Sequence, residues 1–494
     1  SVKSIDGPGF YNMTNSRQPA VSEQYKSTRR LVGLYMNADL GFRDYLYLTL
    51  TARNDWSSTL PQKNNSNFYP GATLSFLLTD FLEKKGVNTG IVDFAKMRVA
   101  YGMTGNDADL YYVYDRFVAA SSSNPGYPNV DDLTFPLNGV NSYSVSNRLG
   151  NSNLKPELTS EFEVGLEANF FKNRVGIDFS YYNRYTKDLI EVLPKDPSTG
   201  YTSQIGNLGD VRNQGFELTL NLTPVRLKDF EWRLSWNMSV NKNKVEKLDV
   251  DEVFLGGYGG AGIYAVEGKA LGQFKIYGVQ KAMVDGKECI VVDGAGMPLE
   301  SVDQEYFGKD INEKYRMGMT NMFTWKGLSL FATLDYRHGG YIYSNTKDYM
   351  HWTGSGPETV YNDRKPFLVP NSVVSNGDGT YSENTVQVDP TALHTFYSNG
   401  NFRGAQEFII SRSYLKLRDA GVAYQLPKSW CSKLGLNGVR LSFNVSNILL
   451  WTPKENAYID PETTTFGNDV SAKFGEFGAN PSNESYSFGL NIAF

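Results

Sequence analysis

Apolar and polar residues alternate with a period of two in segment after segment of this chain. The final ten residues, 485–494, show the pattern most clearly. Successive side chains of a strand point to opposite faces, so this pattern predicts a strand with one apolar face. That face consists of Tyr486, Phe488, Leu490, Ile492 and Phe494, with small or polar residues between them.

The same alternation predicts twelve further strands, which makes thirteen in all. In the segment 413–425 the phase changes after Leu417, and one extra residue at that point predicts a β-bulge. The twelve segments are 31–40, 44–54, 68–78, 95–103, 161–170, 175–181, 216–222, 232–240, 315–325, 328–337, 413–425 and 439–449.

The connections between these segments alternate in length. Short periplasmic turns and long outer loops are typical of outer-membrane barrels, in which the apolar row faces lipid and the other row faces a lumen. The sequence therefore predicts an all-β fold, a transmembrane antiparallel β-barrel. The short or moderate connections are 41–44, 79–93, 171–174, 223–229, 326–327 and 427–438, and the long ones are 55–67, 104–157, 187–210, 245–312, 338–411 and 450–484.

The number of strands predicts a larger barrel than this chain can form. Thirteen strands ending on the short-turn side place residues 1–25 in an outer loop, whereas a complete bacterial barrel has an even number of strands. Open strand edges are untenable in lipid. We therefore expect residues 26–494 to be the C-terminal part of a barrel whose remaining strands come from elsewhere in the same precursor or from a companion chain.

Composition narrows the classes of function. The net charge is −5, so nothing indicates a nucleic-acid footprint, and the two cysteines carry no spacing motif. Aromatic residues make up 14% of the chain, yet the mean hydropathy is −0.40 and no apolar run approaches the roughly 18 residues of a spanning helix. A secreted β-rich glycan-binding or glycan-cleaving protein would have a similar composition, so this alternative stays open.

Nine short segments, in order along nearly the whole chain, resemble the C-terminal half of SusC/RagA-type TonB-dependent transporters. The resemblance implies a barrel of about 22 strands with a plugged lumen, of which this chain supplies the last thirteen. The segments are 53–58 (RNDWSS), 68–71 (FYPG), 97–102 (MRVAYG), 154–157 (LKPE), 213–217 (NQGFE), 315–318 (YRMG), 414–417 (YLKL) with Leu426 and Pro427 following, 444–448 (NVSNI) and the ending from 488 (FGLN) to Phe494.

The resemblance also implies a role. Such transporters lie in the outer membrane of Bacteroidetes-type bacteria and import oligosaccharides or peptides beneath a SusD-like surface lipoprotein that acts as a lid. TonB, ExbB and ExbD supply energy through the plug, which this chain lacks together with the first strands. No enzyme activity and no cofactor are implied. A siderophore or cobalamin receptor of the wider TonB-dependent class is the alternative within transport.

No catalytic or metal site is predicted. His338, His351 and His394 fall at or within one long connection, match no ligand spacing and are expected to be exposed loop residues. The segment 257–262 (GYGGAG) matches a dinucleotide-binding pattern by its letters alone, and is expected to be a flexible surface loop because no helix follows. The acidic stretch 292–303 lacks the regularly spaced ligands of a calcium loop.

Charged residues in the second row predict a hydrated lumen.

Cys289 and Cys431 fall on opposite membrane faces in this topology and are predicted to be free thiols. Glu161 and Glu163 have a spacing compatible with acid–base catalysis, but a repetitive strand pattern gives that reading little weight. The lumen-facing row comprises the acidic Glu161, Glu163, Glu167 and Asp178 and the basic Lys96, Arg98, Arg316 and Arg337.

Aromatic residues of the long connections are the candidate contacts for a substrate or a lid, because aromatic faces stack on sugar rings and anchor protein interfaces. The alternative is a place in the aromatic girdle at the membrane surface, which is the expectation for Trp232, Trp236 and Trp325. The candidates are Trp56, Tyr111, Tyr112, Tyr114, Tyr349 and Trp352, while Tyr486, Phe488, Leu490, Ile492 and Phe494 are the candidate closure and assembly signal.

Overall fold

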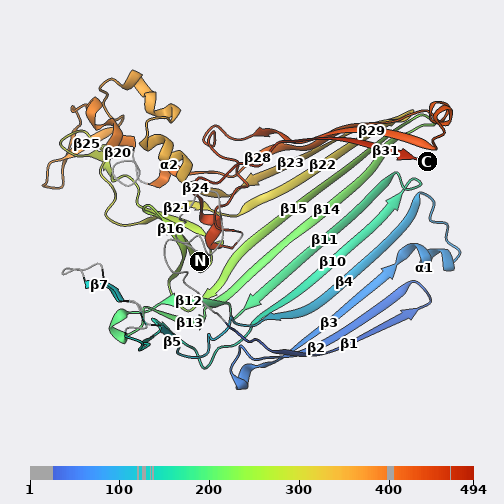
Figure 1. Cartoon of the computed structure of the whole chain (residues 1–494), viewed down its shortest axis with the longest axis horizontal. Coiled ribbons are helices and arrows are strands. Elements are labelled where there is room, and N and C mark those ends of the chain that lie inside the picture. Colours follow the sequence, from blue (N-terminus) through green and yellow to red (C-terminus); the bar gives the residue numbers. More distant parts are fainter. Residues whose placement is uncertain are drawn as a thin grey trace.

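The computed structural model describes residues 26–397 and 405–494, apart from gaps at 120–121, 125–129, 134, 136–137 and 468. Thirteen strands form one antiparallel sheet that curves across the molecule (Figure 1). The predicted strand number and fold class are thereby confirmed. In sheet order the strands are β1 (Leu31–Phe42), β2 (Leu46–Ser57), β3 (Ser66–Leu77), β4 (Val92–Asn106), β10 (Glu157–Phe170), β11 (Val175–Lys187), β14 (Gly209–Arg226), β15 (Phe230–Leu248), β22 (Glu313–Trp325), β23 (Leu328–Gly339), β28 (Tyr414–Gln425), β29 (Gly438–Trp451) and β31 (Ser485–Ala493).

The register of the sheet places the apolar rows on one face. Leu166 lies opposite Met97 and Phe179, and Leu218 lies opposite Phe179 and Met238, so apolar side chains continue from strand to strand. Many of them are exposed, as is expected of a face that contacts lipid. Trp232, Trp236 and Trp325 belong to these rows, as predicted.

The opposite face carries the charged row, and its charges are paired across neighbouring strands. Arg98 contacts Glu163 at 3.1 Å and Asp178 at 3.5 Å, and Arg184 lies 2.7 Å from Glu161. Each carboxylate of the predicted acidic pair therefore has its own guanidinium partner. This arrangement belongs to a polar wall and gives the catalytic reading no support.

The predicted bulge is present in β28. Thr333 and Leu334 of β23 lie opposite Asp419 and Leu417, which leaves Arg418 as the extra residue. Because of it, Leu415 and Leu417 before the bulge and Ala420 and Val422 after it all remain in the apolar row.

The two ends of the sheet differ, as the loop lengths predicted. The end that bears the C-terminus has short connections with two small helices, α1 (Leu78–Lys84) and α4 (Lys428–Cys431), and the 3₁₀ turn η7 (Ser432–Leu434). The other end carries the long connections, which fold into small sheets and helices (Figure 1). Cys289 lies at this outer end and Cys431 at the other, and both are free thiols as predicted.

In the part of the chain that the structure describes, the outer connections contain six further sheets. They are β12 (Ile190–Pro194), β13 (Ser203–Asn207) and β9 (Arg148–Leu149); β16 (Glu252–Tyr258), β17 (Ala261–Val266), β18 (Gln273–Ile276) and β21 (Glu305–Asp310); β19 (Lys281–Val284), β20 (Lys287–Val292), β25 (Ser372–Ser375) and β26 (Tyr381–Glu383); β27 (Ile409–Ser411), β24 (Tyr341–Ser344) and β30 (Gly475–Glu476); β5 (Phe117–Ala119) and β8 (Tyr143–Val145); and β6 (Ser122–Asn124) and β7 (Val130–Leu133).

Short helices complete these connections. They are α2 (Asn345–Trp352), α3 (Leu393–Tyr397) and the 3₁₀ turns η2 (Gln62–Asn64), η3 (Pro197–Thr199), η4 (Pro357–Arg364), η5 (Pro390–Ala392), η6 (Ala405–Phe408) and η8 (Ser471–Phe474). Across the described ranges, no helix has both the length and the apolar character needed to cross a membrane.

Two local expectations are wrong. The segment 257–262 is the turn of the hairpin β16–β17, with positive φ at Gly259 and Gly260, and is therefore part of a sheet instead of a flexible loop. Trp56 belongs to β2 instead of a long connection, because the ladder with β1 continues to Ser57. Its side chain follows Leu48, Leu50 and Ala52 in the outward row.

Candidate functional site: the outer end of the barrel wall

Three of the outer connections, 245–312, 338–411 and 450–484, share a hydrophobic core. Phe274, Tyr343, Phe408 and Phe474 are all buried, although they come from four different parts of the sequence. The Tyr343 and Phe474 rings stack with their centroids 5.4 Å apart. This core fixes the positions of the connections 245–312, 338–411 and 450–484 relative to one another, so that they can present a defined surface.

Ion pairs between side chains hold the last outer connection, 452–484, against the inner face of the wall. In β28, Tyr414 and Lys416 alternate with the outward Leu415 and Leu417 and therefore point inward. Lys416 Nζ lies 2.7 Å from both carboxylate oxygens of Asp460 and 2.7 Å from Glu462 Oε2. Both partners belong to the connection, which these contacts hold against the strand.

The bulge of β28 enlarges this network. It leaves Arg418 inward as well, where its guanidinium contacts Glu462 and donates from Nε to Asp335 Oδ2 at 2.9 Å. Arg316 of β22 donates to the same Asp335 oxygen at 2.8 Å, and the Tyr414 hydroxyl donates to Glu462 at 2.8 Å. Three cations thus face three carboxylates: Lys416, Arg316 and Arg418 against Asp335, Asp460 and Glu462.

The cations of this network keep the partly buried carboxyl groups of the connection ionised. Burial alone would raise the pKa of Glu462, but hydrogen bonds from Arg418, Lys416 and Tyr414 lower it to about 2. Burial would likewise raise the pKa of Asp460, and the hydrogen bonds from Lys416 and Ser482 lower it. Arg412 donates to the Pro461 carbonyl at 2.9 Å, and burial lowers the pKa of its guanidinium to about 10. The segment 460–462 is therefore anchored through side chains and backbone.

The predicted aromatic contacts fall into two groups at the outer end. Tyr111 and Tyr112 lie beneath the guanidinium groups of Arg116 and Arg148, whose carbons are 5.1 and 4.5 Å from the ring centroids, and Tyr114 is exposed nearby in sequence. Tyr349 and Trp352 are exposed on α2. Trp56 belongs to neither group, since it lies in the outward row of β2.

The expectation of exposed loop histidines is wrong for His351 and for His338. His351 is buried, with its Nε2 3.1 Å from Glu358 and its ring 5.6 Å from that of Phe408, because α2 packs into the core of the outer loops. His338 is partly buried at the end of β23, and His394 is exposed. Among the residues that the structure describes, no three His, Cys, Asp or Glu side chains are grouped as a metal ion would require.

The ionic anchor was not foreseen from the sequence. Lys416 and Arg418 alternate with apolar residues, which marks them as inward-facing, but nothing in that pattern identifies their partners. Asp460 and Glu462 are two acidic residues in a long connection without periodicity. The one feature of the sequence that could have indicated the anchor is the inward position of Lys416, since a buried lysine needs an acidic partner.

These features define the class of the protein: the wall and outer loops of an outer-membrane β-barrel. The family model described as "TonB dependent receptor-like, beta-barrel" matches residues 3–273, which is more than half of the chain. The chain belongs to this family of outer-membrane receptors, and the family prediction is confirmed.

Individual relatives agree with this assignment. TonB-dependent receptor P3 of Formosa agariphila is 27% identical over 515 residues, which cover 98% of this chain and 48% of that protein. TonB-dependent receptor SusC of Bacteroides thetaiotaomicron is 28% identical over 250 residues, which cover 49% of this chain and 24% of that protein. The chain spans about half the length of the first of these.

Solved structures show the same fold. The RagAB peptide transporter matches with a TM-score of 0.73 at 20% identity, over 99% of this chain and 50% of the matched chain. The same assembly in a state described as closed-closed gives a TM-score of 0.72. At this identity the likeness concerns the fold alone.

Proposed function

We propose that this chain is the C-terminal barrel portion, residues 26–494, of a SusC-like TonB-dependent importer of oligosaccharides or peptides. The observation that carries the proposal is the combination of an open thirteen-stranded sheet with large, folded and ionically anchored loops at one end only. Residues 1–25, proposed as an outer-loop segment, lie outside the described residues.

The two edges of the sheet support a larger barrel. β1 and β31 each pair with one neighbour, β2 and β29. The apolar side chains of both strands are exposed, and Phe488 is 84% exposed. Unpaired backbone groups are too costly in lipid for either edge to stay open. We propose that the remaining strands and a plug complete the barrel, and that TonB, ExbB and ExbD act on this plug. The row from Tyr486 to Phe494 then serves closure and assembly.

A lid is supported by an exposed patch of three aromatic side chains and one aliphatic side chain on the outer loops. Tyr349 and Trp352 of α2, with Val360 and Tyr361 of η4, are between 51% and 60% exposed. Aromatic side chains of this kind anchor protein interfaces. We propose that this patch contacts a SusD-like lipoprotein, and that Tyr111, Tyr112 and Tyr114 contact the lid or the substrate. The chain performs no catalytic step.

The experiment is affinity capture of the full-length receptor from the outer membrane of its own host. Tyr349→Ser with Trp352→Ser should reduce recovery of the lipoprotein by at least about tenfold, since one central aromatic anchor contributes about 2 kcal/mol or more, roughly a thirtyfold change in affinity. The matched control is Trp430→Ser, because Trp430 is equally exposed but lies on α4 at the opposite end of the barrel. Equal recovery from both variants would reject the patch as the lid contact.

Transport is tested separately. Cells that contain only the wild-type receptor should take up labelled oligosaccharides or peptides of a size excluded by porins, and dissipation of the proton gradient should stop the uptake. Uptake that continues without the gradient would contradict the TonB-dependent mechanism. The labelled class that is accumulated identifies the substrate.

A further inference from the structure

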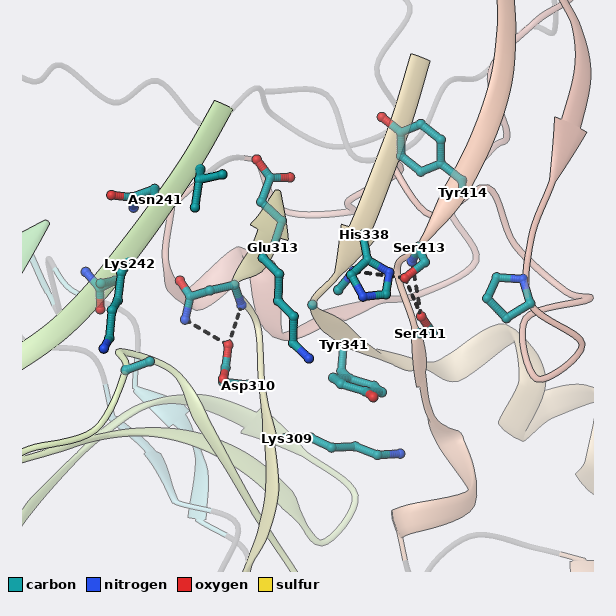
Figure 2. Close-up of a pocket in the computed structure, with 18 of the residues that line it drawn as sticks. Asn241, Lys242, Lys309, Asp310, Glu313, His338, Tyr341, Ser411, Ser413 and Tyr414 are labelled. Atoms are coloured by element: carbon teal, nitrogen blue, oxygen red, sulfur yellow. Dashed lines mark hydrogen bonds between the residues drawn. The ribbon is translucent and has the colours of Figure 1, made fainter. Parts of the chain in front are cut away.

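A cavity of about 940 Å³ opens in the wall where β15 and β22 separate (Figure 2). The ladder between these strands ends at the pair Ser239 and Arg316, whereas β15 continues to Leu248. The segments that contain Ala270 and Lys309 border the space that remains. The cavity is therefore a consequence of two neighbouring strands having unequal lengths beyond their shared ladder.

The strand register shows that one part of the cavity lining faces outward. Val240 and Lys242 continue the row of Trp236 and Met238 on β15, which faces lipid. On β23, Tyr336 and His338 continue the outward row of Leu330 and Leu334. Figure 2 shows Lys242, Lys309 and Tyr341 in the lower part of the opening, and Glu313 and Tyr414 above them. The outward residues of the lining accordingly meet the membrane surface, whereas Tyr414, an inward residue of the ionic anchor, borders the cavity from its inner side.

The cavity is cationic. Lys242, Lys244, Lys309 and Lys314 line it. Within the described residues, Lys242 and Lys314 are exposed and form no ion pair, whereas Lys244 contacts Glu246 at 2.8 Å. The Lys309 ammonium lies 4.5 Å from the ring centroids of Phe307 and Tyr341.

The acidic residues of the lining are engaged elsewhere. Glu313 contacts Arg337 at 3.1 Å on the inner side of the wall. Asp310 accepts hydrogen bonds of 2.8 and 3.0 Å from the backbone and side-chain amides of Asn312. Arg337 neutralises Glu313, and among the described residues neither carboxylate forms an ion pair with Lys242 or Lys314, which leaves these two lysines available to an anionic ligand.

The position of the cavity identifies the class of ligand. Tyr315, Tyr336 and His338 form an aromatic cluster on the outward face beside it, with ring centroids 4.9–6.4 Å apart. Aromatic residues of this kind mark the membrane–water boundary. Basic pockets at this level attract the phosphates of lipid headgroups. We propose that the cavity binds the phosphorylated headgroup of an outer-leaflet glycolipid.

This site is independent of import, because it lies on the lipid side of the wall. It would fix the local lipid shell beside the outer loops and close the gap between β15 and β22. Lys242 and Lys314 contact the phosphate, while Trp451 and Leu415, both outward residues of the lining, contact the lipid adjacent to the headgroup.

The experiment uses the full-length receptor in detergent, with diphosphorylated lipid A as the probe and native mass spectrometry as the readout. Lys242→Gln with Lys314→Gln should weaken binding about fivefold for each lysine removed. Lys281→Gln is the matched control, because Lys281 is an exposed lysine of the outer loops outside the cavity lining. Heat-dependent gel mobility confirms that each variant is folded.

Two further probes distinguish a lipid-binding site from a site for any phosphate anion. Lipid A stripped of its phosphates should bind at least about tenfold more weakly than the diphosphorylated form, and inorganic phosphate should not compete at millimolar concentration. Binding that is unchanged in the double variant would overturn the proposal. Competition by inorganic phosphate would overturn the lipid assignment in favour of a free-anion site.

Discussion

Lys416 and Asp460 form a buried ion pair between a membrane strand and the last outer loop. The lysine Nζ lies 2.7 Å from both carboxylate oxygens, and each side chain is only 2% exposed. Removal of one partner from such a pair leaves an uncompensated buried charge, which is far more costly than the loss of a surface ion pair. The pair therefore fixes where the loop 452–484 lies.

Lys416→Met should release this loop without unfolding the wall. The expected cost is about 3–5 kcal/mol, because Asp460 loses its cation while still buried. Amide hydrogen exchange should become faster in residues 452–484 and stay slow in the ladder of β28 and β29. The control is Lys96→Met, whose ammonium lies 3.8 Å from Glu167 in a partly exposed pair worth less than about 1 kcal/mol. Exchange in the loop that equals that of the wild type would show that the pair is not the anchor.

The anchor should weaken in acid through Glu462. Its pKa of about 2 in the folded protein lies below the ordinary value of 4.5, so its ionised form stabilises the anchored state. This contribution is fully present above about pH 4.5 and is lost as the pH falls towards 2. The stability difference between the wild type and Glu462→Gln in urea should therefore shrink as the pH falls below 4.5. A difference that stays constant between pH 7 and 3 would contradict the assignment.

The strands were predictable from the sequence because lipid on one face and water on the other impose alternation on every strand. The thirteen segments, the bulge at Arg418 and the loop asymmetry all follow from that constraint. Strand ends are less predictable, because beyond the lipid boundary both faces of a strand meet water and the alternation loses its cause. Trp56, which the alternation places in a loop, therefore lies in β2, where it pairs with Val32.

The outer loops were not predictable in the same way. His351 is buried because α2 packs against residues distant in sequence, such as Phe408, and no local pattern encodes such a contact. The anchor is similar, since Asp460 and Glu462 acquire their role only when the loop folds back onto β28. The mixed charge of the lumen was predicted, whereas these particular partners were not.

Gly215 should be essential for the pairing of β14 and β15. A Cβ atom at this position would lie 1.9 Å from the backbone oxygen of Val240, which cannot move without breaking the ladder. Gly215→Ala should destabilise the barrel by about 1–3 kcal/mol or more, measured as a lower urea midpoint for loss of the heat-modifiable gel band. Gly102→Ala is the control, since a Cβ there meets nothing within 4 Å. If Gly215→Ala and Gly102→Ala had equal urea midpoints, β14 and β15 would be able to move apart enough to accept the added methyl group.

A hydrogen bond between Trp232 and Asn321 lies on the lipid face, and its contribution to stability can be measured separately. Trp232 Nε1 donates a hydrogen bond of 3.2 Å to Asn321 Oδ1, and both residues belong to outward rows. In hydrocarbon an unsatisfied amide is costly, so Trp232→Phe should destabilise the barrel by about 1–3 kcal/mol. Asn321→Leu should cost a similar amount, because it leaves the indole Nε1–H without an acceptor.

The double variant then provides the test of this pair. With Asn321→Leu present, Trp232→Phe should cost less than about 1 kcal/mol, so that the two substitutions are strongly non-additive. Trp236→Phe is the control, because Trp236 lies in the same row but makes no side-chain hydrogen bond with the described residues. If Trp232→Phe costs the same with and without Asn321, the indole contributes through packing on Phe323, whose ring stacks 5.7 Å away, and not through its hydrogen bond.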